Sequence, residues 1–286
     1  MGDVVVFDGF SLRSQGPTLT MSLGAGQSML ILGPAASGKT KMLRSILGDE
    51  RARQGLVSCN GSVAVAGLGS VSRKTTPAHL GTKFAGKRQV GVVAEALQAL
   101  RLRNVSDEPI VDLSPSQRVA CELLPILCTR TSVALIDSQL DVLDPWCRAS
   151  ALDALRSKQS SGTCLIATSN RAELAPLFDT ILVMESNQVK FVGGLEELMR
   201  QSTESSVTIE SITQEGVRAL VDPFTIRVRE TANGTTFLAE EGQQVAAKLL
   251  LEGYGNVRFV VLREPTPEEA VTNLVRGLAA NDSSVS

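Results

Sequence analysis

The sequence predicts an α/β domain with a mostly parallel β-sheet, followed by a small α+β domain. Apolar segments of strand length alternate with helical segments over the first 200 residues, which is typical of a parallel sheet covered on both faces. One strand leads through a glycine-containing loop directly into a helix. The chain has 30 acidic and 28 basic side chains. Residues 201–286 contain 12 of the acidic and 7 of the basic ones, so the net charge is −5 in this segment and +3 in residues 1–200.

At 286 residues, the chain is longer than one typical domain. We expect a main domain over residues 1–200, a small α+β domain over residues 201–278 and a disordered tail over residues 279–286. The tail consists mostly of small and polar residues, which is typical of an unstructured chain end.

Hydrophobic periodicity and turn residues locate the elements. Short strands are predicted over residues 3–7 and 19–23, and a buried strand over Ser28–Leu32 precedes the first helix. A glycine- and serine-rich connection follows this helix. Further strands are expected over residues 61–67, 132–137, 163–168 and 180–185, and helices over 90–102, 113–129, 144–159 and 194–201. In the small domain, strands are expected over residues 205–212, 224–230 and 256–264, and helices over 240–253 and 265–278.

The composition argues against several classes of function. No apolar run reaches the roughly 18–20 residues of a membrane span, and the N-terminus has no signal-peptide pattern, so we expect a cytosolic chain. His79 is the only histidine, which argues against a zinc centre or a Ser-His triad. The cysteines lie in apolar segments without C-x-x-C spacing and are expected to be buried thiols.

The strongest motif is Gly-Pro-Ala-Ala-Ser-Gly-Lys-Thr, from Gly33 to Thr40, which matches G-x-x-x-x-G-K-[ST]. Its glycines let backbone N–H groups surround phosphate oxygens at a helix N-terminus, its lysine reaches the outer phosphates, and its threonine hydroxyl binds Mg²⁺. The predicted flanking strand and helix provide the context that this loop requires. The residues expected to bind phosphate are Gly33, Pro34, Ala35, Ser37, Gly38, Lys39, Thr40 and Lys41.

Asp137 is the expected second part of this site. It ends the apolar strand Val-Ala-Leu-Ile-Asp, and such a strand delivers a carboxylate to the sheet edge, where these folds hold Mg²⁺ through water. We therefore expect Thr40 and Asp137 to hold the metal. Ser138 follows, at the position where a nucleotide hydrolase of this kind would have a glutamate that activates water.

A third motif, Leu-Ser-Pro-Ser-Gln, occupies residues 113–117 and ends 20 residues before Asp137. With this motif, residues 3–200 resemble the ATP-binding cassette (ABC) family, the nucleotide-binding subunits of ABC transporters, whose signature is Leu-Ser-Gly-Gly-Gln at a similar spacing. The resemblance implies a P-loop NTPase fold with a helical subdomain over about residues 69–125. It also implies ATP and Mg²⁺ as cofactors.

The signature motif implies a paired arrangement. In the family, two subunits face head to tail, and each signature closes over the ATP of the partner. Ser114 would meet the γ-phosphate, Gln117 would lie beside it, and Asp144 corresponds to the D-loop of the family. Pro115 and Ser116 replace the two glycines of the signature. Pro115 removes a backbone N–H, and Ser116 adds a side chain where close approach is needed.

Other positions depart from the family in a consistent way. Ser138 replaces the catalytic glutamate, and Ser169 stands in place of the switch histidine, so the predicted catalytic set is empty. No glutamine lies near Leu68, and no tyrosine precedes the phosphate loop to stack on adenine, although Phe10 is a candidate substitute. The resemblance with these departures predicts a degenerate subunit that binds Mg-ATP but is a weak or inactive ATPase on its own.

The implied function is that of a nucleotide-binding subunit on the cytosolic face of a membrane. Its implied partners are a membrane permease and a second ABC ATPase subunit, in a homodimer or a heterodimer. Residues 257–278 are similar to the C-terminal extension of ATPases that serve ABC-2-type exporters, and a generic strand–helix unit is the alternative.

Three other interpretations stay open. The first is a scaffold protein that uses ATP as a structural ligand. The second is a soluble ABC ATPase of nucleic-acid metabolism. We do not expect a nucleic-acid partner, because Phe84 is the only aromatic residue in the basic segment 73–103; that segment is a solvated face or a surface for a membrane partner or anionic lipid. The third is an active ATPase with Asp141 or Glu173 as its base.

Overall fold

This computed structural model of the protein describes residues 2–68, 72, 74–86, 89–200, 205–211, 225–231, 234–239, 242–252, 257–263 and 266–282. The chain forms two compact units, Met1–Gly194 and Leu195–Ser286. The domain boundary predicted from the sequence lies after residue 200 instead. The difference is helix α8 (Leu195–Arg200), which contacts helix α11 (Pro267–Asp282) and therefore belongs to the second unit.

The central sheet of the first unit has six strands in the order β5-β6-β7-β3-β8-β9. They are β3 (Ser28–Leu32), β5 (Val63–Ala66), β6 (Val133–Asp137), β7 (Cys164–Ser169), β8 (Thr180–Glu185) and β9 (Gln188–Gly193). All pairs are parallel except that of β8 and β9. The predicted mostly parallel α/β fold is therefore confirmed. Parallel strands end at the same edge, so the ends of β3, β6 and β7 lie close together there.

A second sheet of three antiparallel strands has the order β2-β1-β4. Its strands are β1 (Asp3–Ser11), β2 (Leu19–Gly24) and β4 (Gln54–Cys59). The main core joins alternate residues of the central strands to this sheet and to helix α1 (Lys39–Leu47). Members include Met29 and Ile31 of β3, and Leu135 of β6, because successive side chains of a strand point to opposite faces.

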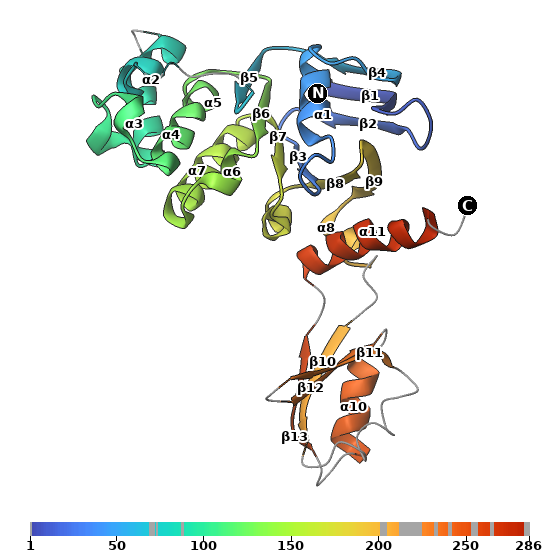
Figure 1. Ribbon diagram of the computed structural model, residues 1–286. Helices are drawn as coiled ribbons and strands as arrows, with labels where there is room; N and C mark the ends of the chain where they lie inside the picture. Colours follow the sequence, from blue (N-terminus) through green and yellow to red (C-terminus); the bar gives the residue numbers. More distant parts are fainter. Residues whose placement is uncertain are drawn as a thin grey trace. The chain divides into compact units, whose positions relative to one another are not determined.

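The helices of the first unit form two groups, one against the central sheet and one to the side of it (Figure 1). Besides α1 they are α2 (Pro77–Ala85), α3 (Val90–Ala99), α4 (Pro115–Glu122), α5 (Leu124–Cys128), α6 (Gln139–Val142) and α7 (Pro145–Ser160). Short 3-10 segments lie at Arg103–Val105, Ile110–Asp112 and Ala172–Leu177. Helices α2 to α5 contact one another, within the range expected for a helical subdomain. The helix predicted over 113–129 is divided at Leu123, because Pro125 follows in the first turn of α5.

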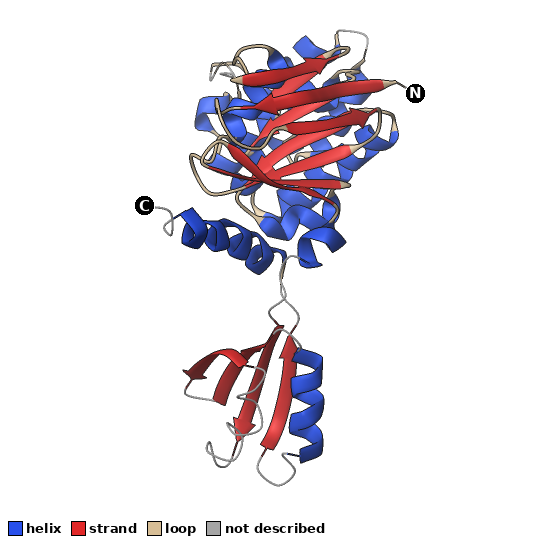
Figure 2. Ribbon diagram, turned by 90° about the vertical axis from the view of Figure 1, so that its right-hand side faces the viewer, coloured by secondary structure: helices blue, strands red, loops and turns tan. Residues whose placement is uncertain are grey.

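The second unit contains a four-stranded antiparallel sheet in the order β11-β12-β10-β13. Its strands are β10 (Ser205–Ser211), β11 (Thr225–Thr231), β12 (Gly234–Ala239) and β13 (Val257–Arg263). Helix α10 (Gly242–Glu252) contacts β10, β12 and β13, and lies along this sheet in Figure 2. Helix α11 continues to Asp282 and includes the first part of the predicted tail, because Ala279 and Ala280 favour a helix. Residues 283–286 lie outside the described residues.

Two expectations from composition can be compared with this fold. Among the described helices, none combines the length and apolar character that crossing a bilayer requires. The five cysteines are free thiols, and all except the partly buried Cys59 are buried, as predicted. Burial raises the pKa of Cys121 and Cys164 to about 12, so these thiols remain protonated at neutral pH.

Phe10 belongs to the main core. Its side chain is 1% exposed, and its ring centroid lies 5.4 Å from that of Phe7 at an interplanar angle of 70°. A ring enclosed in this way has no face available for a base. The suggestion that Phe10 replaces the adenine-stacking tyrosine is therefore wrong.

We expect Phe10→Leu to lower the free energy of unfolding by about 1–3 kcal/mol, because it removes an edge-to-face aromatic contact and leaves a small cavity. Urea unfolding measures this change. The affinity for ATP should stay within about twofold of the unchanged chain. Phe84→Leu is the matched control, because Phe84 is 37% exposed. A selective loss of ATP affinity in Phe10→Leu at unchanged stability would show that Phe10 touches the base.

Candidate functional site

The loop between β3 and α1 has a backbone that only glycine can adopt at its two ends. Gly33 has φ of 152° and Gly38 has φ of 106°. A Cβ atom on Gly33 would lie 2.1 Å from the carbonyl oxygen of Met184, and one on Gly38 would lie 2.8 Å from Oδ1 of Asn187. The N-terminus of α1 begins after Gly38 without a side-chain cap. This geometry leaves backbone N–H groups available to an anion, as the motif predicts.

Lys39 is folded back onto this loop. Its side chain is 7% exposed, and Nζ donates to the carbonyl oxygens of Gly33 at 2.7 Å and Pro34 at 2.8 Å. It also donates to Oδ1 of Asn170 at 2.9 Å. Burial lowers the pKa of the Lys39 ammonium from its ordinary value, and the carboxylates of Asp141 and Asp137 act in the opposite direction. The loop therefore supplies oxygen partners that stabilise a buried positive charge.

Asp137 and Thr40 lie in direct contact, as the predicted metal site requires. Thr40 Oγ1 is 2.8 Å from Oδ2 and 3.1 Å from Oδ1 of Asp137. Thr168 of β7 donates to the same carboxylate at 2.7 Å and shares a hydrogen bond of 3.2 Å with Ser138 Oγ. A hydroxyl beside a carboxylate suits the oxygen-ligand preference of Mg²⁺, so these residues fit the metal.

Ser138 adopts a left-handed backbone with φ of 64° at the start of α6. Its hydroxyl is engaged with Thr168. A neutral hydroxyl bonded in this way is not a general base at neutral pH.

Ser169 is hydrogen-bonded to Asp141. Its side chain is buried, and Oγ donates to Oδ1 of Asp141. The other oxygen of Asp141 accepts from the backbone N–H of Asn170 at 2.9 Å. The next side chain, Asn170, reaches Lys39 instead. Ser169, where the resemblance would place the switch histidine, is therefore buried, and the next residue, Asn170, contacts Lys39 of the loop.

A cavity of about 550 Å³ lies over the phosphate loop. Its lining residues are Ala35, Ala36, Ser37, Gly38, Lys39, Thr40, Lys41, Arg44, Ser138, Asn170 and Asn187. Most predicted phosphate-binding residues are among them, while Gly33 and Pro34 contribute carbonyl oxygens to Lys39. Sequence reasoning missed Ala36, Arg44, Asn170 and Asn187. Arg44 could have been predicted from its position four residues after Thr40 in the same helix, and Asn170 from its position after the end of a parallel strand. No local pattern links Asn187 to this loop.

The signature residues lie outside this cavity and serve the local fold. Ser114 caps α4: its Oγ accepts from Gln117 N at 3.3 Å, and Gln117 Oε1 accepts from Ser114 N at 2.9 Å. Ser116 Oγ donates to Oδ2 of Asp144 at 2.8 Å, and Asp144 caps α7 by accepting from Cys147 N at 2.9 Å. The added side chain of Ser116 thus links α4 to α7. Within one chain, Ser114, Gln117 and Asp144 do not meet the phosphate loop.

The sequence has no glutamine near Leu68, but the fold places Gln139 next to Gly67. A Cβ atom on Gly67 would lie 2.1 Å from Oε1 of Gln139, which begins α6. Gln139 donates through Nε2 to Glu122 at 2.7 Å, and its buried Oε1 has no hydrogen-bond partner. It does not line the cavity over the loop.

These features together define a P-loop nucleotide-binding domain, with a lysine and a threonine at a helix N-terminus and an aspartate from a neighbouring strand. Residues 17–140, within the first unit, match the family described as ABC transporter, so this part of the chain is similar to ABC ATPases.

Similar proteins support this assignment. The chain is 28% identical over 203 residues to the Fe(3+) ions import ATP-binding protein FbpC of Escherichia coli O157:H7, a match that covers 64% of this chain and 58% of that protein. The chain thus spans little more than half the length of this relative. It is also 26% identical over 295 residues to the Nod factor export ATP-binding protein I of Rhizobium meliloti, covering 96% of this chain and 84% of that protein.

Solved structures share the fold. An ATP binding subunit of an ABC transporter superposes with a TM-score of 0.59 at 17% identity and covers 69% of this chain and 92% of its own. A nucleotide-free ATP-binding cassette from an ABC transporter gives a TM-score of 0.57 at 18% identity, covering 70% and 94%. The P-loop fold predicted from the sequence is confirmed.

Ala36 adopts a left-handed conformation with φ of 62° within the loop. We expect Ala36→Gly to raise the free energy of unfolding by about 1 kcal/mol, because glycine has no Cβ to strain this conformation. Thermal and urea unfolding measure the change. Ala35→Gly is the matched control, because Ala35 is in the same loop without a positive φ, and it should be neutral or destabilising. Equal effects of both substitutions would show that Ala36 carries no strain.

Ser116→Ala removes the link between α4 and Asp144. We expect the free energy of unfolding to fall by about 1–2 kcal/mol, because a hydrogen bond to a charged group is lost. Ser160→Ala, at the exposed end of α7, is the control and should change it by less than about 0.5 kcal/mol. Urea unfolding of both variants decides the question, and equal stabilities would mean that the link contributes nothing.

Proposed function

We propose that this chain is the nucleotide-binding subunit of an ABC transporter, and that it binds Mg-ATP at the phosphate loop but hydrolyses it slowly or not at all. The observation that carries the proposal is the lining of the loop cavity. It includes the cations Lys39, Lys41 and Arg44, and contains no aspartate, glutamate or histidine. Such a cavity suits a polyphosphate, but it lacks a group to take a proton from water.

The two alternative bases have other partners. Asp141 uses both carboxylate oxygens to accept from Ser169 Oγ and Asn170 N. Glu173 forms ion pairs with Arg148 at 3.2 Å and Arg171 at 3.1 Å. Neither residue lines the cavity. These contacts support a binding site in preference to an efficient ATPase.

Nucleotide binding would exchange one set of oxygen partners for another. The ammonium of Lys39 would leave Asn170 and the loop carbonyls for the outer phosphates, while Lys41 and Arg44 would add positive charge. Thr40 and Asp137 would hold Mg²⁺, which neutralises phosphate charge when it is bound. Because the present partners of Lys39 are also oxygens, the exchange keeps its charge compensated.

The proposed partners are a membrane permease and a second ABC ATPase subunit, and no nucleic acid. In a head-to-tail pair, Ser114, Gln117 and Asp144 would approach the nucleotide of the partner. A heterodimer is favoured, because Ser138 would leave both sites of a homodimer without a base. One relative whose match covers 96% of this chain is an export ATP-binding protein. This favours an exporter on the cytosolic face of a membrane and supports the likeness of residues 257–278 to exporter ATPases.

ATP binding and hydrolysis by the purified chain test the proposal. We expect magnesium-dependent binding of ATP with negligible turnover, and loss of binding in Lys39→Ala, because the lysine is the main positive partner of the phosphates. Ser138→Glu should raise turnover by up to about 10²- to 10⁴-fold, because it restores a general base. The left-handed backbone at Ser138 will reduce that gain.

Ser138→Gln is the matched control, because it has the shape of glutamate without its basicity. Rapid turnover by the unchanged chain would overturn the degenerate site, and absence of ATP binding would overturn the nucleotide-binding role. Copurification with a multispanning protein and a second ATPase would support the transporter. Copurification with other proteins only would favour a scaffold.

A further inference from the structure

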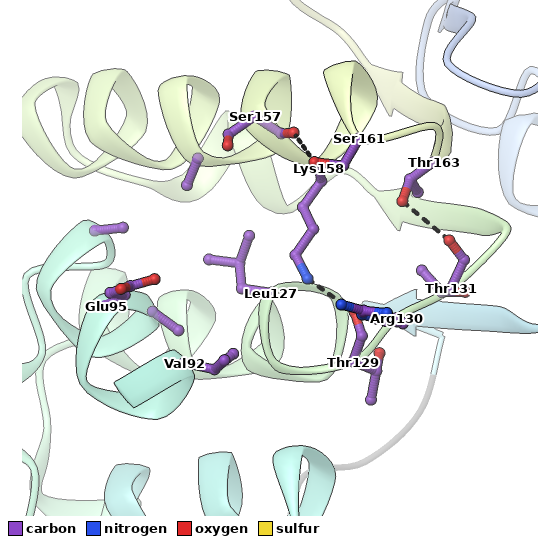
Figure 3. A pocket seen from close by; sticks show the side chains of 13 residues that line it. Val92, Glu95, Leu127, Thr129, Arg130, Thr131, Ser157, Lys158, Ser161 and Thr163 are labelled. Carbon is purple, nitrogen blue, oxygen red and sulfur yellow. Dashed lines mark hydrogen bonds between the residues drawn. The ribbon is translucent and has the colours of Figure 1, made fainter. Parts of the chain in front are cut away.

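A second cavity, of about 660 Å³, lies apart from the phosphate loop in the first unit (Figure 3). It is enclosed by α3, the end of α5, the C-terminal half of α7 and the segments that precede β6 and β7. The lining residues are Val92, Glu95, Ala96, Ala99, Leu127, Thr129, Arg130, Thr131, Ala154, Ser157, Lys158, Ser161 and Thr163. Its size is that of a small-molecule site, for which about 300–1,000 Å³ is usual.

Two cations meet at one end of this cavity. Figure 3 shows the side chains of Lys158 and Arg130 next to each other. Lys158 Nζ donates to the carbonyl oxygen of Thr129 at 2.8 Å, which leaves two of its three N–H donors available. Burial lowers the pKa of the Lys158 ammonium from its ordinary value, negative charge on the neighbouring Cys128 sulfur would raise it, and the positive charge of Arg130 lowers it further. Like charges held together in this way are stabilised by an anion between them.

No acidic side chain neutralises this pair among the described residues. Neither cation takes part in an ion pair there, and the one carboxylate in the lining, Glu95, belongs to α3 on the opposite side in Figure 3. An unpaired arginine carries five N–H donors in a planar fork that suits carboxylates and phosphates.

The carbonyl oxygens at the C-terminal ends of α5 and α7 do not require both of these positive charges. At the end of α7, the carbonyl oxygens of Ser157, Lys158 and Gln159 already accept from backbone N–H groups of the following turn. Lys158 completes the end of α5 by its bond to Thr129 O. Arg130 has no such role, so its guanidinium is available to a ligand.

Five of the other eleven lining residues are apolar. Val92, Ala96 and Ala99 of α3 face Leu127 of α5 and Ala154 of α7. Hydroxyl groups near the cations are already donors to backbone carbonyls, as Thr163 is to Thr131 O at 2.9 Å. The charged end can therefore bind an anionic group, while the apolar wall can cover a short hydrocarbon body.

We propose that this cavity is a binding site for a small organic anion, whose carboxylate or phosphate contacts Arg130 and Lys158 and whose apolar part lies against α3 and Leu127. The site is independent of the nucleotide site and does not rest on the proposed function. A bound ligand would contact α3 and α7 together.

Titration calorimetry of the whole chain tests this proposal with inorganic phosphate and n-butyl phosphate at constant ionic strength. The Lys39→Ala background keeps the phosphate loop from contributing. We expect saturable binding of both, tighter for n-butyl phosphate by about tenfold or more because of its apolar body. Arg130→Gln should weaken both by about tenfold or more. Glu95→Gln should strengthen both, because it removes a negative charge from the lining.

Arg156→Gln is the matched control, because Arg156 is on α7 outside the lining and pairs with Asp153. Hydrogen exchange should show protection by n-butyl phosphate over residues 92–99, 127–131 and 154–163. Absence of saturable binding in the Lys39→Ala background would overturn the proposal. Equal losses in Arg130→Gln and Arg156→Gln would overturn it as well, because binding would then follow net charge and not this cavity.

Discussion

Lys39 places a positive charge where only 7% of the residue is exposed, and three oxygen atoms converge on its ammonium group. A buried charge without partners would cost several kcal/mol, so the loop has to turn its carbonyl groups inward. That conformation requires Gly33 at φ of 152°, packed against the carbonyl of Met184. The loop and Asn170, which follows β7, are therefore held together around one charge. In the proposed function, a polyphosphate would replace these oxygen partners.

The positions at which the chain departs from its family have acquired other contacts. Ser138 bonds to Thr168, Ser169 bonds to Asp141, and Ser116 bonds to Asp144. Each is a short hydroxyl side chain that completes a local hydrogen-bond network, and the first two networks end at carboxylates near Lys39. The buried hydroxyl groups of these networks thereby have hydrogen-bond partners. In the proposed function, Lys39, Thr40 and Asp137 would hold phosphate and metal, while these serine positions would serve the stability of the fold.

Three of the elements that sequence reasoning missed are strands with a weak pattern or with a position set by neighbouring strands. Strand β4 is only partly buried and lies in a glycine- and serine-rich segment, so its pattern is weak. Strand β9 follows β8 through the turn residues Ser186 and Asn187, both with positive φ, and its pairing depends on β8. Strand β12 lies between β11 and β10 in the sheet, and only the strand pairing in the structure reveals this order. Strands buried on both faces and helices with clear periodicity were located correctly, because their apolar pattern is strong.

The sequence by itself determined the parallel α/β fold, the phosphate loop with Lys39 and Thr40, and the pairing of that loop with Asp137. These are local patterns, because a strand, a loop and a helix in succession carry their own geometry. Only the tertiary structure decided that Phe10 is a core residue, that Asn170 and not Ser169 faces Lys39, and that Arg130 and Lys158 share a cavity. In each case the partners come from separate segments of the chain. The packing of the sheet and helices brings them together, and no periodicity or spacing in one segment records that contact.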